Sequence, residues 1–268
     1  MTQSQPTSPP VQTHELVVLK PKPTHAEISE MQCRYYDLHA GSYDQLELSV
    51  ERRRKFAEAA CAFVVEGLQG LEPCTRLLSV GCGTGRKERE ITQALGRSLE
   101  IVGIEPSSQM ATLSRAAGLS VHLGTLDTFH SAAPFDASMF FYALPTLATE
   151  ELRLGALQQL RNHLRRGARL FVDVEPSDDQ YGWAPEVAAL YEREHLRDAG
   201  YDPGDFLYRR LGTEEVAFWH FFSEEELTAL LERAGFAVVR CRYIGFFKRP
   251  GEIVERGEGT LIVEAEVV

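Results

Sequence analysis

The chain has 268 residues, 44% of them hydrophobic and 25% charged, a composition ordinary for a globular protein large enough to bury a substantial core. Its 39 acidic residues exceed its 28 Lys and Arg residues, and the formal net charge of -11 argues against a protein built mainly to neutralise nucleic-acid phosphates. The five cysteines are odd in number, widely spaced and without a CxxC pair, so the sequence predicts neither a disulfide framework nor a bound metal.

The N-terminal part of the sequence divides into an arm and a helical region. Residues 1–25 are rich in Pro, Ser, Thr and Gln, and we expect a mobile arm or a strap that docks late. Residues 26–72 have apolar side chains at helical spacing and predict a helical lid, with the basic cluster 52–55 on its solvated side. The arm has no basic stretch followed by an apolar one, and no apolar run reaches membrane-spanning length. We therefore expect a cytoplasmic protein with no membrane partner.

Residues 73–268 have the rhythm of a core domain. Short apolar runs alternate with amphipathic stretches, which is typical of a parallel sheet covered by helices on both faces. The predicted strands are RLLSV, EIVGI, SVHL, FDASMFF and ARLFVDV, and the helices between them are predicted at about 85–95, 107–117 and 149–164. This order predicts a doubly wound α/β domain.

An insertion at about 176–222 interrupts the alternation with several prolines and glycines around one helix, predicted near 185–198. After it, Ser223 and Glu226 have the spacing of a capping box, which predicts a helix that ends at Gly235. The segments FAVVRCRYI and TLIVEAEVV are predicted to close the chain as an antiparallel pair of strands at one sheet edge.

The most informative stretch is the loop that follows the first buried strand, with glycines at positions 81, 83 and 85. Glycines there let the backbone turn tightly and approach a ligand. A dinucleotide-binding GxGxxG loop would need a glycine in place of Arg86, so the loop favours a nucleoside without a pyrophosphate and disfavours an NAD oxidoreductase. Glu105 ends the next strand about twenty residues later, where a carboxylate can accept both hydroxyls of a ribose.

Several stretches of the chain resemble the class I S-adenosylmethionine-dependent methyltransferases, over roughly residues 76–175 and 223–244. The matching stretches are LLSVGCGTG, IVGIEPSSQM, HLGTLDTF, FDASMFFYALPTL, LRRGARLFVDVEP and SEEELTALLERAGF. The resemblance implies a Rossmann-like seven-stranded sheet, mostly parallel with a C-terminal antiparallel strand. It also implies S-adenosyl-L-methionine as cofactor and S-adenosyl-L-homocysteine as product. A serine before the glycine loop and Glu-Pro-Ser after the second strand are similar to the histamine N-methyltransferase group.

The resemblance also implies which residues bind the cofactor. An aromatic residue on the preceding helix lies over the cofactor; Tyr43 is the first candidate for it, and Tyr35 or Tyr36 is the next. Two positions depart from the family pattern: Ser79 stands where an acid is usual, and Thr125 where an Asp is common, and Glu88 is a candidate to replace the missing charge. The full predicted cofactor set is Tyr43, Ser79, Gly81, Cys82, Gly83, Gly85, Glu105, Pro106, Met110, Thr125, Leu126, Asp127 and Phe141.

The acceptor is expected beyond the carboxyl ends of the fourth and fifth strands, because ligands of open α/β sheets bind there. Aromatic side chains beside acids in this part of the chain suit a cationic acceptor, through ion pairing and cation–π contact. The predicted acceptor-binding residues are Tyr142, Glu175, Asp179, Tyr181, Trp183 and Trp219. The candidates for a general base are His220, Tyr142 and His39.

The sequence therefore predicts an S-adenosylmethionine-dependent methyltransferase of the EC 2.1.1 type that methylates nitrogen or oxygen of a small molecule. Two alternatives remain at this point. One is a cofactor-binding sensor or scaffold that no longer methylates, motivated by Ser79 and Thr125; the other is the same fold adapted to another reaction, such as a cyclisation. We expect a monomer or homodimer with no nucleic-acid partner.

Overall fold

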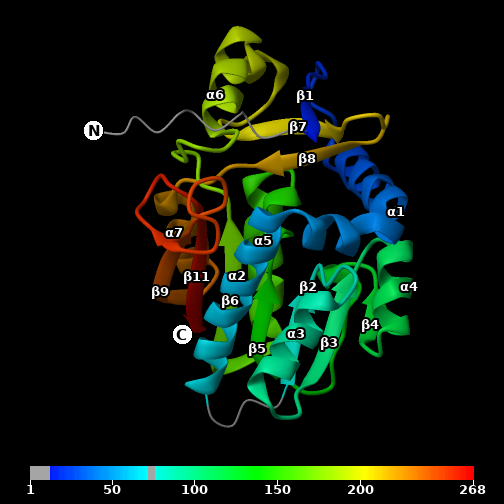
Figure 1. The fold of residues 1–268 in the computed structure, drawn as a ribbon, viewed down its shortest axis with the longest axis vertical. Coiled ribbons are helices and arrows are strands. Elements are labelled where there is room, and N and C mark those ends of the chain that lie inside the picture. Colours follow the sequence, from blue (N-terminus) through cyan, green and yellow to red (C-terminus); the bar gives the residue numbers. More distant parts are fainter. Residues whose placement is uncertain (1–12, 72–75) are drawn as a thin grey trace.

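The computed structural model describes residues 13–71 and 76–268, and a large sheet forms its centre (Figure 1). The strand order in this sheet is β10-β9-β11-β6-β5-β2-β3-β4. The strands that pair in parallel are β2 (Arg76–Val80), β3 (Glu100–Glu105), β4 (Ser120–Leu123), β5 (Phe135–Phe140) and β6 (Leu164–Val174).

The other edge of the central sheet is antiparallel. Strand β11 (Thr260–Val267) pairs antiparallel with both β6 and β9 (Phe236–Ile244), and the short strand β10 (Ile253–Val254) pairs antiparallel with β9. The predicted Rossmann-like α/β fold is confirmed. The seven expected strands are all present, and β10 adds an eighth at the edge.

Helices cover both faces of the central sheet. Leu77 on β2 packs with α2 (Glu51–Gln69) and α3 (Arg86–Leu95), whereas the next residue, Leu78, packs with α5 (Glu150–Asn162) and α7 (Glu224–Arg233). This alternation follows from the pleat of the strand, on which successive side chains point to opposite faces. Helix α4 (Ser108–Ala116) packs beside β4.

The predicted N-terminal lid is smaller than expected. Helix α2 buries Phe56, Phe63 and Val64 against the sheet and is therefore part of the core, which leaves α1 (His25–Ser49) as the lid. The predicted boundary between lid and core, at 72–73, lies outside the described residues.

A second, three-stranded sheet lies across the end of the central sheet where the parallel strands terminate (Figure 1). Its strands are β1 (His14–Val17), β7 (Asp205–Arg210) and β8 (Val216–His220), all antiparallel. The described part of the predicted arm thus docks as a strand, while residues 1–12 lie outside the described part of the chain. The insertion holds α6 (Ala184–Arg193) and two strands rather than a single helix among loops. The predicted helix at 185–198 ends early, because His195 has a φ of +50°.

Helix α1 is held between the two sheets by hydrogen bonds from its side chains to backbone groups and hydroxyls of neighbouring elements. The amide of Gln32 donates to the carbonyl of Phe218 on β8 (3.0 Å) and accepts from its N–H (3.1 Å). Asp37 accepts from the Ser107 hydroxyl (2.5 Å) and the Gln109 N–H (3.0 Å) at the start of α4. One turn before its C-terminal end, α1 contacts the glycine loop, where Asp44 accepts from the Thr84 hydroxyl (2.8 Å). These bonds fix α1 across the carboxyl end of the central sheet.

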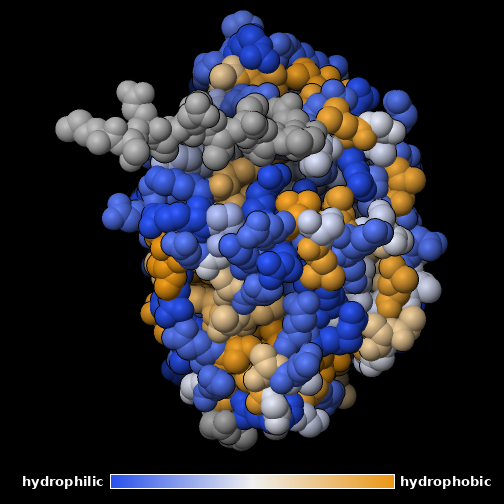
Figure 2. Space-filling view, viewed as in Figure 1, coloured by the Kyte–Doolittle hydropathy of each residue, from blue (hydrophilic) through white to orange (hydrophobic). Residues whose placement is uncertain are grey.

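On the face shown in Figure 2, hydrophobic residues are interspersed among hydrophilic ones, which is ordinary for a protein surface. Within 13–71 and 76–268, no helix is long and apolar enough to cross a membrane. The concave features lie between α1, the two sheets and the loops at the carboxyl end of the parallel strands.

Candidate active site

The glycine loop borders a cavity of about 390 Å³ at the carboxyl end of β2. Gly81 and Gly83 have φ values of +69° and +55°, a conformation that side-chain-bearing residues rarely adopt. A Cβ on Gly81 would lie 2.7 Å from the Cβ of Ala143, while the space beside Gly83 is open. Gly85 borders neither this cavity nor the second one described below. It directly precedes α3, and a Cβ there would lie 2.6 Å from the Ser114 hydroxyl. The loop therefore presents its backbone at Gly81 and Gly83 to the cavity.

Glu105 both fixes the glycine loop and faces the cavity. Its carboxylate accepts the N–H of Gly83 (2.8 Å) and the N–H of Ser107 (2.9 Å). Burial raises the pKa of Glu105 to about 7, against the opposing effect of these two bonds. A carboxylate has about four lone-pair sites, so Glu105 retains capacity to accept hydroxyl groups.

Glu88 and Ser79 form a buried pair at the base of the same cavity. The Ser79 hydroxyl donates to Oε1 of Glu88 at 2.5 Å. The other oxygen, Oε2, is buried and has no hydrogen-bond partner among the described residues. Burial raises the pKa of Glu88 and outweighs the opposing effects of the Ser79 hydrogen bond and of the charges on Lys87 and Arg89. Sequence reasoning named Glu88 only as a possible substitute; the strand-to-helix turn brings it onto Ser79.

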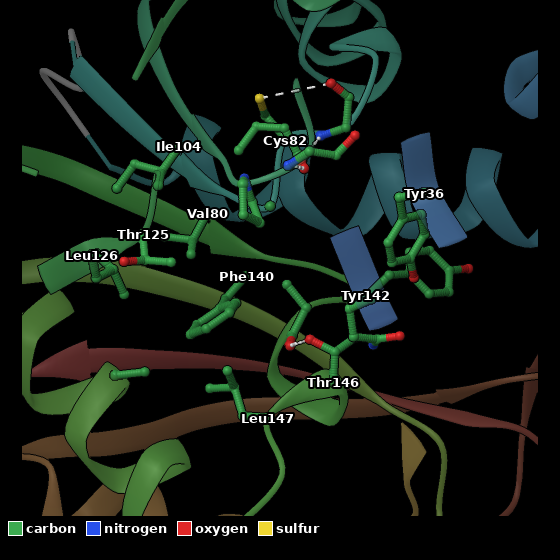
Figure 3. Close-up of a pocket in the computed structure, with 18 of the residues that line it drawn as sticks. Tyr36, Val80, Cys82, Ile104, Thr125, Leu126, Phe140, Tyr142, Thr146 and Leu147 are labelled. Carbon is green, nitrogen blue, oxygen red and sulfur yellow. Dashed lines mark hydrogen bonds between the residues drawn. The ribbon is translucent and has the colours of Figure 1, made fainter. Parts of the chain in front are cut away.

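The remaining cofactor candidates surround the cavity from end to end. Figure 3 shows Thr125 and Leu126 at one end, and Tyr36 and Tyr142 at the other. Tyr36 and Tyr43 are seven residues apart on α1, so the two rings share one helix face. The other predicted residues that border this cavity are Cys82, Pro106, Met110, Asp127 and Phe141.

A second cavity, of about 210 Å³, adjoins the first and shares Tyr36, Tyr43 and Tyr142 with it. Ring side chains from distant parts of the chain form most of its wall. They are His14, Tyr35, Tyr36, Tyr43, Tyr142, Trp183, Phe206, Tyr208, Trp219, Phe221, Phe246 and Phe247. Its charged residues are Glu47, Glu175, Asp179 and Arg53. Of the predicted acceptor residues, this cavity brings together Tyr142, Glu175, Asp179, Trp183 and Trp219.

Tyr142 stands at the junction of the two cavities in an unusual backbone conformation. Its φ is +56°, a left-handed value that is uncommon for a residue with a side chain. The carboxylate of Asp173, buried at the end of β6, holds this conformation by accepting the Tyr142 N–H at 2.7 Å. The ammonium of Lys87 lies 4.1 Å from the ring centroid. Strain of this kind is concentrated at functional sites, where surrounding structure maintains it.

Besides Gly85, three predicted site residues lie outside both cavities: His220, His39 and Tyr181. Both ring nitrogens of His220 bond carboxylates, Nδ1 to Asp205 (2.7 Å) and Nε2 to Glu226 (3.0 Å). Burial opposes its charge, but these two bonds raise the pKa of His220 and engage both of its ring nitrogens, so it is held in a buried cluster of ionisable side chains. His39 packs edge-on against Tyr35. Tyr181 is 41% exposed, and its hydroxyl bonds Lys248.

The phenols of the second cavity are unsuited to act as bases. Burial, followed by the nearby acids Asp173, Glu47 and Glu175, raises the pKa of Tyr142 well above its usual value. Burial likewise raises the pKa values of Tyr43 and Tyr208. A raised pKa argues against the prediction that Tyr142 is the base, and its ring lies at the junction of the two cavities.

The prediction that the basic cluster 52–55 lies on the solvated side of its helix is wrong for Arg53. Its guanidinium lies at the second cavity and pairs with Glu47 at 2.5 Å. Sequence reasoning missed Tyr208 and the pair Phe246–Phe247. Their only signal was aromaticity, which in a sequence cannot be told from ordinary core packing.

Comparison with protein families shows that a model described as a methyltransferase domain matches residues 50–240. Among solved structures, one similar chain is 1,6-didemethyltoxoflavin-N1-methyltransferase from Burkholderia thailandensis, bound to 1,6-didemethyltoxoflavin and S-adenosylhomocysteine. It is 16% identical, has a TM-score of 0.63, and the match covers 99% of this chain and 100% of that one.

Two further solved structures are similar over most of their length. A possible histamine N-methyltransferase from Thermotoga maritima is 19% identical, with a TM-score of 0.56 over 87% of this chain and 98% of that one. An amino pentose methyltransferase from Micromonospora echinaspora, with S-adenosylmethionine bound, is 23% identical, with a TM-score of 0.50 over 78% and 91%. At these identities the similarity shows the fold. No curated protein matches the sequence.

Proposed function

The chain belongs to the class I S-adenosylmethionine-dependent methyltransferases, and from this premise we propose that it methylates a nitrogen or oxygen atom of a small molecule. The cofactor is S-adenosyl-L-methionine. The observation that carries the proposal is the junction of the two cavities at Tyr36, Tyr43 and Tyr142. One cavity has the glycine loop and Glu105, and the other has aromatic walls, so a cofactor and an acceptor would meet at these three rings.

The residues of the first cavity fit the cofactor. The open space beside Gly83 lets the backbone approach a ligand, and Glu105 retains capacity to accept ribose hydroxyls. The unpartnered Oε2 of Glu88 is matched by an ammonium group, so Ser79 and Glu88 together would replace the acid that is usual at position 79. Thr125, Leu126 and Asp127 would border the adenine at the opposite end. When bound, the cofactor supplies a methyl group on a positively charged sulfur.

The chain's own contribution to the reaction is to position the acceptor and accept its proton. Methyl transfer is an in-line displacement, so the acceptor lone pair must be aligned about 3 Å from the methyl carbon. The rings at the junction would hold the acceptor in that line and exclude water. Burial, with Asp173 nearby, raises the pKa of Glu175 to about 8, so among the described acids of the second cavity it is suited to hold a proton near neutral pH.

Calorimetry and a labelled-methyl assay test this proposal. We expect the purified protein to bind S-adenosyl-L-homocysteine at sub-millimolar concentration, and to move labelled methyl from the cofactor into a small molecule of a metabolite extract. Failure to bind either form of the cofactor would overturn the proposal. Binding without transfer to any extract fraction would favour the sensor or scaffold instead.

A further inference from the structure

The second cavity has the size, the walls and the charge of a binding site for one kind of acceptor. We infer that this acceptor is an amine carried by a flat ring, and that Glu175 receives its nitrogen. The inference rests on the proposed function, since it concerns the acceptor half of the same site.

The walls of the second cavity select a flat ring. Trp219 lies between Tyr142 and Tyr208, with ring centroids 6.5 Å from each, and Trp183 lies 6.0 Å from Phe206. A cavity of about 150 Å³ takes benzene. The volume of about 210 Å³ therefore has room for one ring and a short polar group.

The charges around the second cavity favour a cation. Its three carboxyl groups face one guanidinium, and Arg53 is already paired with Glu47. Burial and nearby arginines lower the pKa of His14 to about 4, so this imidazole is neutral at pH 7 and adds no positive charge. Glu175 and Asp179 are thus left without a cation among the residues bordering the cavity. Aromatic ring faces attract a cation as well, since their quadrupole is negative at the face.

Glu175 has an unmet need for a hydrogen-bond donor. Its Oε2 is buried and makes no hydrogen bond of ordinary geometry within the described part of the chain, and the same holds for the indole nitrogen of Trp219. The two groups are neighbours, because the indole N–H opposes the rise in the pKa of Glu175. Leaving such groups unpaired costs free energy, so an occupant that satisfies both is favoured. An amine N–H would donate to Glu175, and an acceptor atom on the ring would take the Trp219 N–H.

The proton and electron balance of the transfer is then complete. In the empty site near pH 7 Glu175 holds a proton, and an amine that enters as an ammonium displaces this proton to solvent and pairs with the carboxylate. The ammonium then passes one proton to Glu175, which leaves a lone pair on nitrogen. That lone pair forms the new N–C bond as the S–C bond breaks, and the S–C electron pair stays on sulfur. The methylated nitrogen takes over the positive charge, and Glu175 keeps its proton when the product leaves.

Intrinsic fluorescence offers a direct test, because the only two tryptophans of the sequence, Trp183 and Trp219, both border this cavity. Probes are three matched pairs of equal shape: benzylamine and benzyl alcohol, 2-phenylethylamine and 2-phenylethanol, and tryptamine and tryptophol. Each is titrated into protein saturated with S-adenosyl-L-homocysteine, with calorimetry for the indole pair, which fluoresces itself. For at least one pair we expect the amine to bind about tenfold or more tightly than its alcohol, as a charge-assisted bond provides.

Two variants test whether Glu175 causes the preference for the amine over the alcohol. Glu175→Gln should reduce the ratio of amine to alcohol affinity to under about threefold, since a neutral amide gives no ion pair. Binding of S-adenosyl-L-homocysteine should be unchanged. Asp178→Asn is the matched control, because Asp178 lies on the exposed side of the same loop and pairs with Arg256 at 2.8 Å; it should keep the preference. No preference in any pair, or a preference that survives Glu175→Gln, would overturn the inference. Absence of S-adenosyl-L-homocysteine binding at the outset would count against the proposed function instead.

Discussion

The two cavities of this protein are built in different ways. Part of the first cavity comes from the loop after β2, the end of β3 and the turn after β4, which all lie within residues 79–127, and side chains of α1 and of residues 139–159 complete it. The second is lined by side chains from well-separated parts of the chain, between His14 and Thr260. The glycine loop and Glu105 are held by backbone hydrogen bonds, so changes there disturb the loop itself, whereas the aromatic side chains of the second cavity can be altered residue by residue without disturbing the sheet. The difference indicates that the first cavity tolerates fewer substitutions than the second.

The largest effect is expected from Glu105→Ala, which removes two hydrogen bonds to a carboxylate that hold the glycine loop. We expect the affinity for S-adenosyl-L-homocysteine to fall about 100-fold, because hydrogen bonds to charged groups each contribute about 1.5–3 kcal/mol. Asp179→Ala, at the second cavity, should leave the affinity for S-adenosyl-L-homocysteine within about twofold of the parent protein, since the Asp179 carboxylate bonds a neighbouring residue of its own loop, Tyr181. Calorimetry measures both, and equal losses would show that the two cavities are not independent.

The next effect concerns Glu88→Gln. Loss of the negative charge should weaken S-adenosyl-L-homocysteine binding roughly tenfold, since an ammonium would lose a charge-assisted bond. 5′-Methylthioadenosine lacks the amino-acid part and serves as the matched probe, so its affinity should barely change. A comparable loss for both ligands would mean that Glu88 acts by supporting the loop rather than by binding the ammonium.

A smaller effect is expected on stability and its dependence on pH. Glu175 has a folded-state pKa of about 8 against an ordinary value of 4.5, so between these values the folded protein holds a proton that the unfolded chain has lost. The free energy of unfolding should therefore fall as pH rises from about 5 to 8.

The variant Glu175→Gln separates this residue from Asp173 and Glu105, whose pKa values are also raised. Its free energy of unfolding should fall less over the same range, by on the order of 1 kcal/mol, as measured by urea unfolding at pH 5, 6.5 and 8. Parallel curves for the variant and the parent protein would show that Glu175 is not buried as a neutral acid.

The smallest effect is expected from Tyr181→Phe. The Tyr181 hydroxyl bonds Lys248 at the surface and borders neither cavity, so binding of the amine probes should stay within about twofold of the parent protein. Fluorescence titration checks this. A tenfold loss would show that the loop around Tyr181 closes over the second cavity when it is occupied.

Much of the fold followed from local patterns. The alternation of apolar runs and helices predicted the sheet, and the capping box at Ser223 and Glu226 predicted α7, whose Ser223 does accept from the Glu226 N–H. The small sheet was missed, because β1 and β7 are stabilised by pairing between segments almost 200 residues apart. His220 shows the same limit: it was predicted as a candidate base, but its two carboxylate partners come from β7 and α7, which the sequence does not place beside it.

The sequence by itself determined the class of sheet, the cofactor loop and the position of Glu105, because these depend on residues that are neighbours along the chain. Only the tertiary structure decided what the acceptor site is made of. The packing of α1 between two sheets brings Tyr36 and Tyr43 to the cavity that Glu175 borders, and the start of α2 brings Arg53 there. Tyr142, with its left-handed backbone, borders both cavities. The physical reason is that side chains meet across a cavity only when whole helices and strands pack together. The spacing of residues along the chain predicts single helices and strands, but it does not show how they pack.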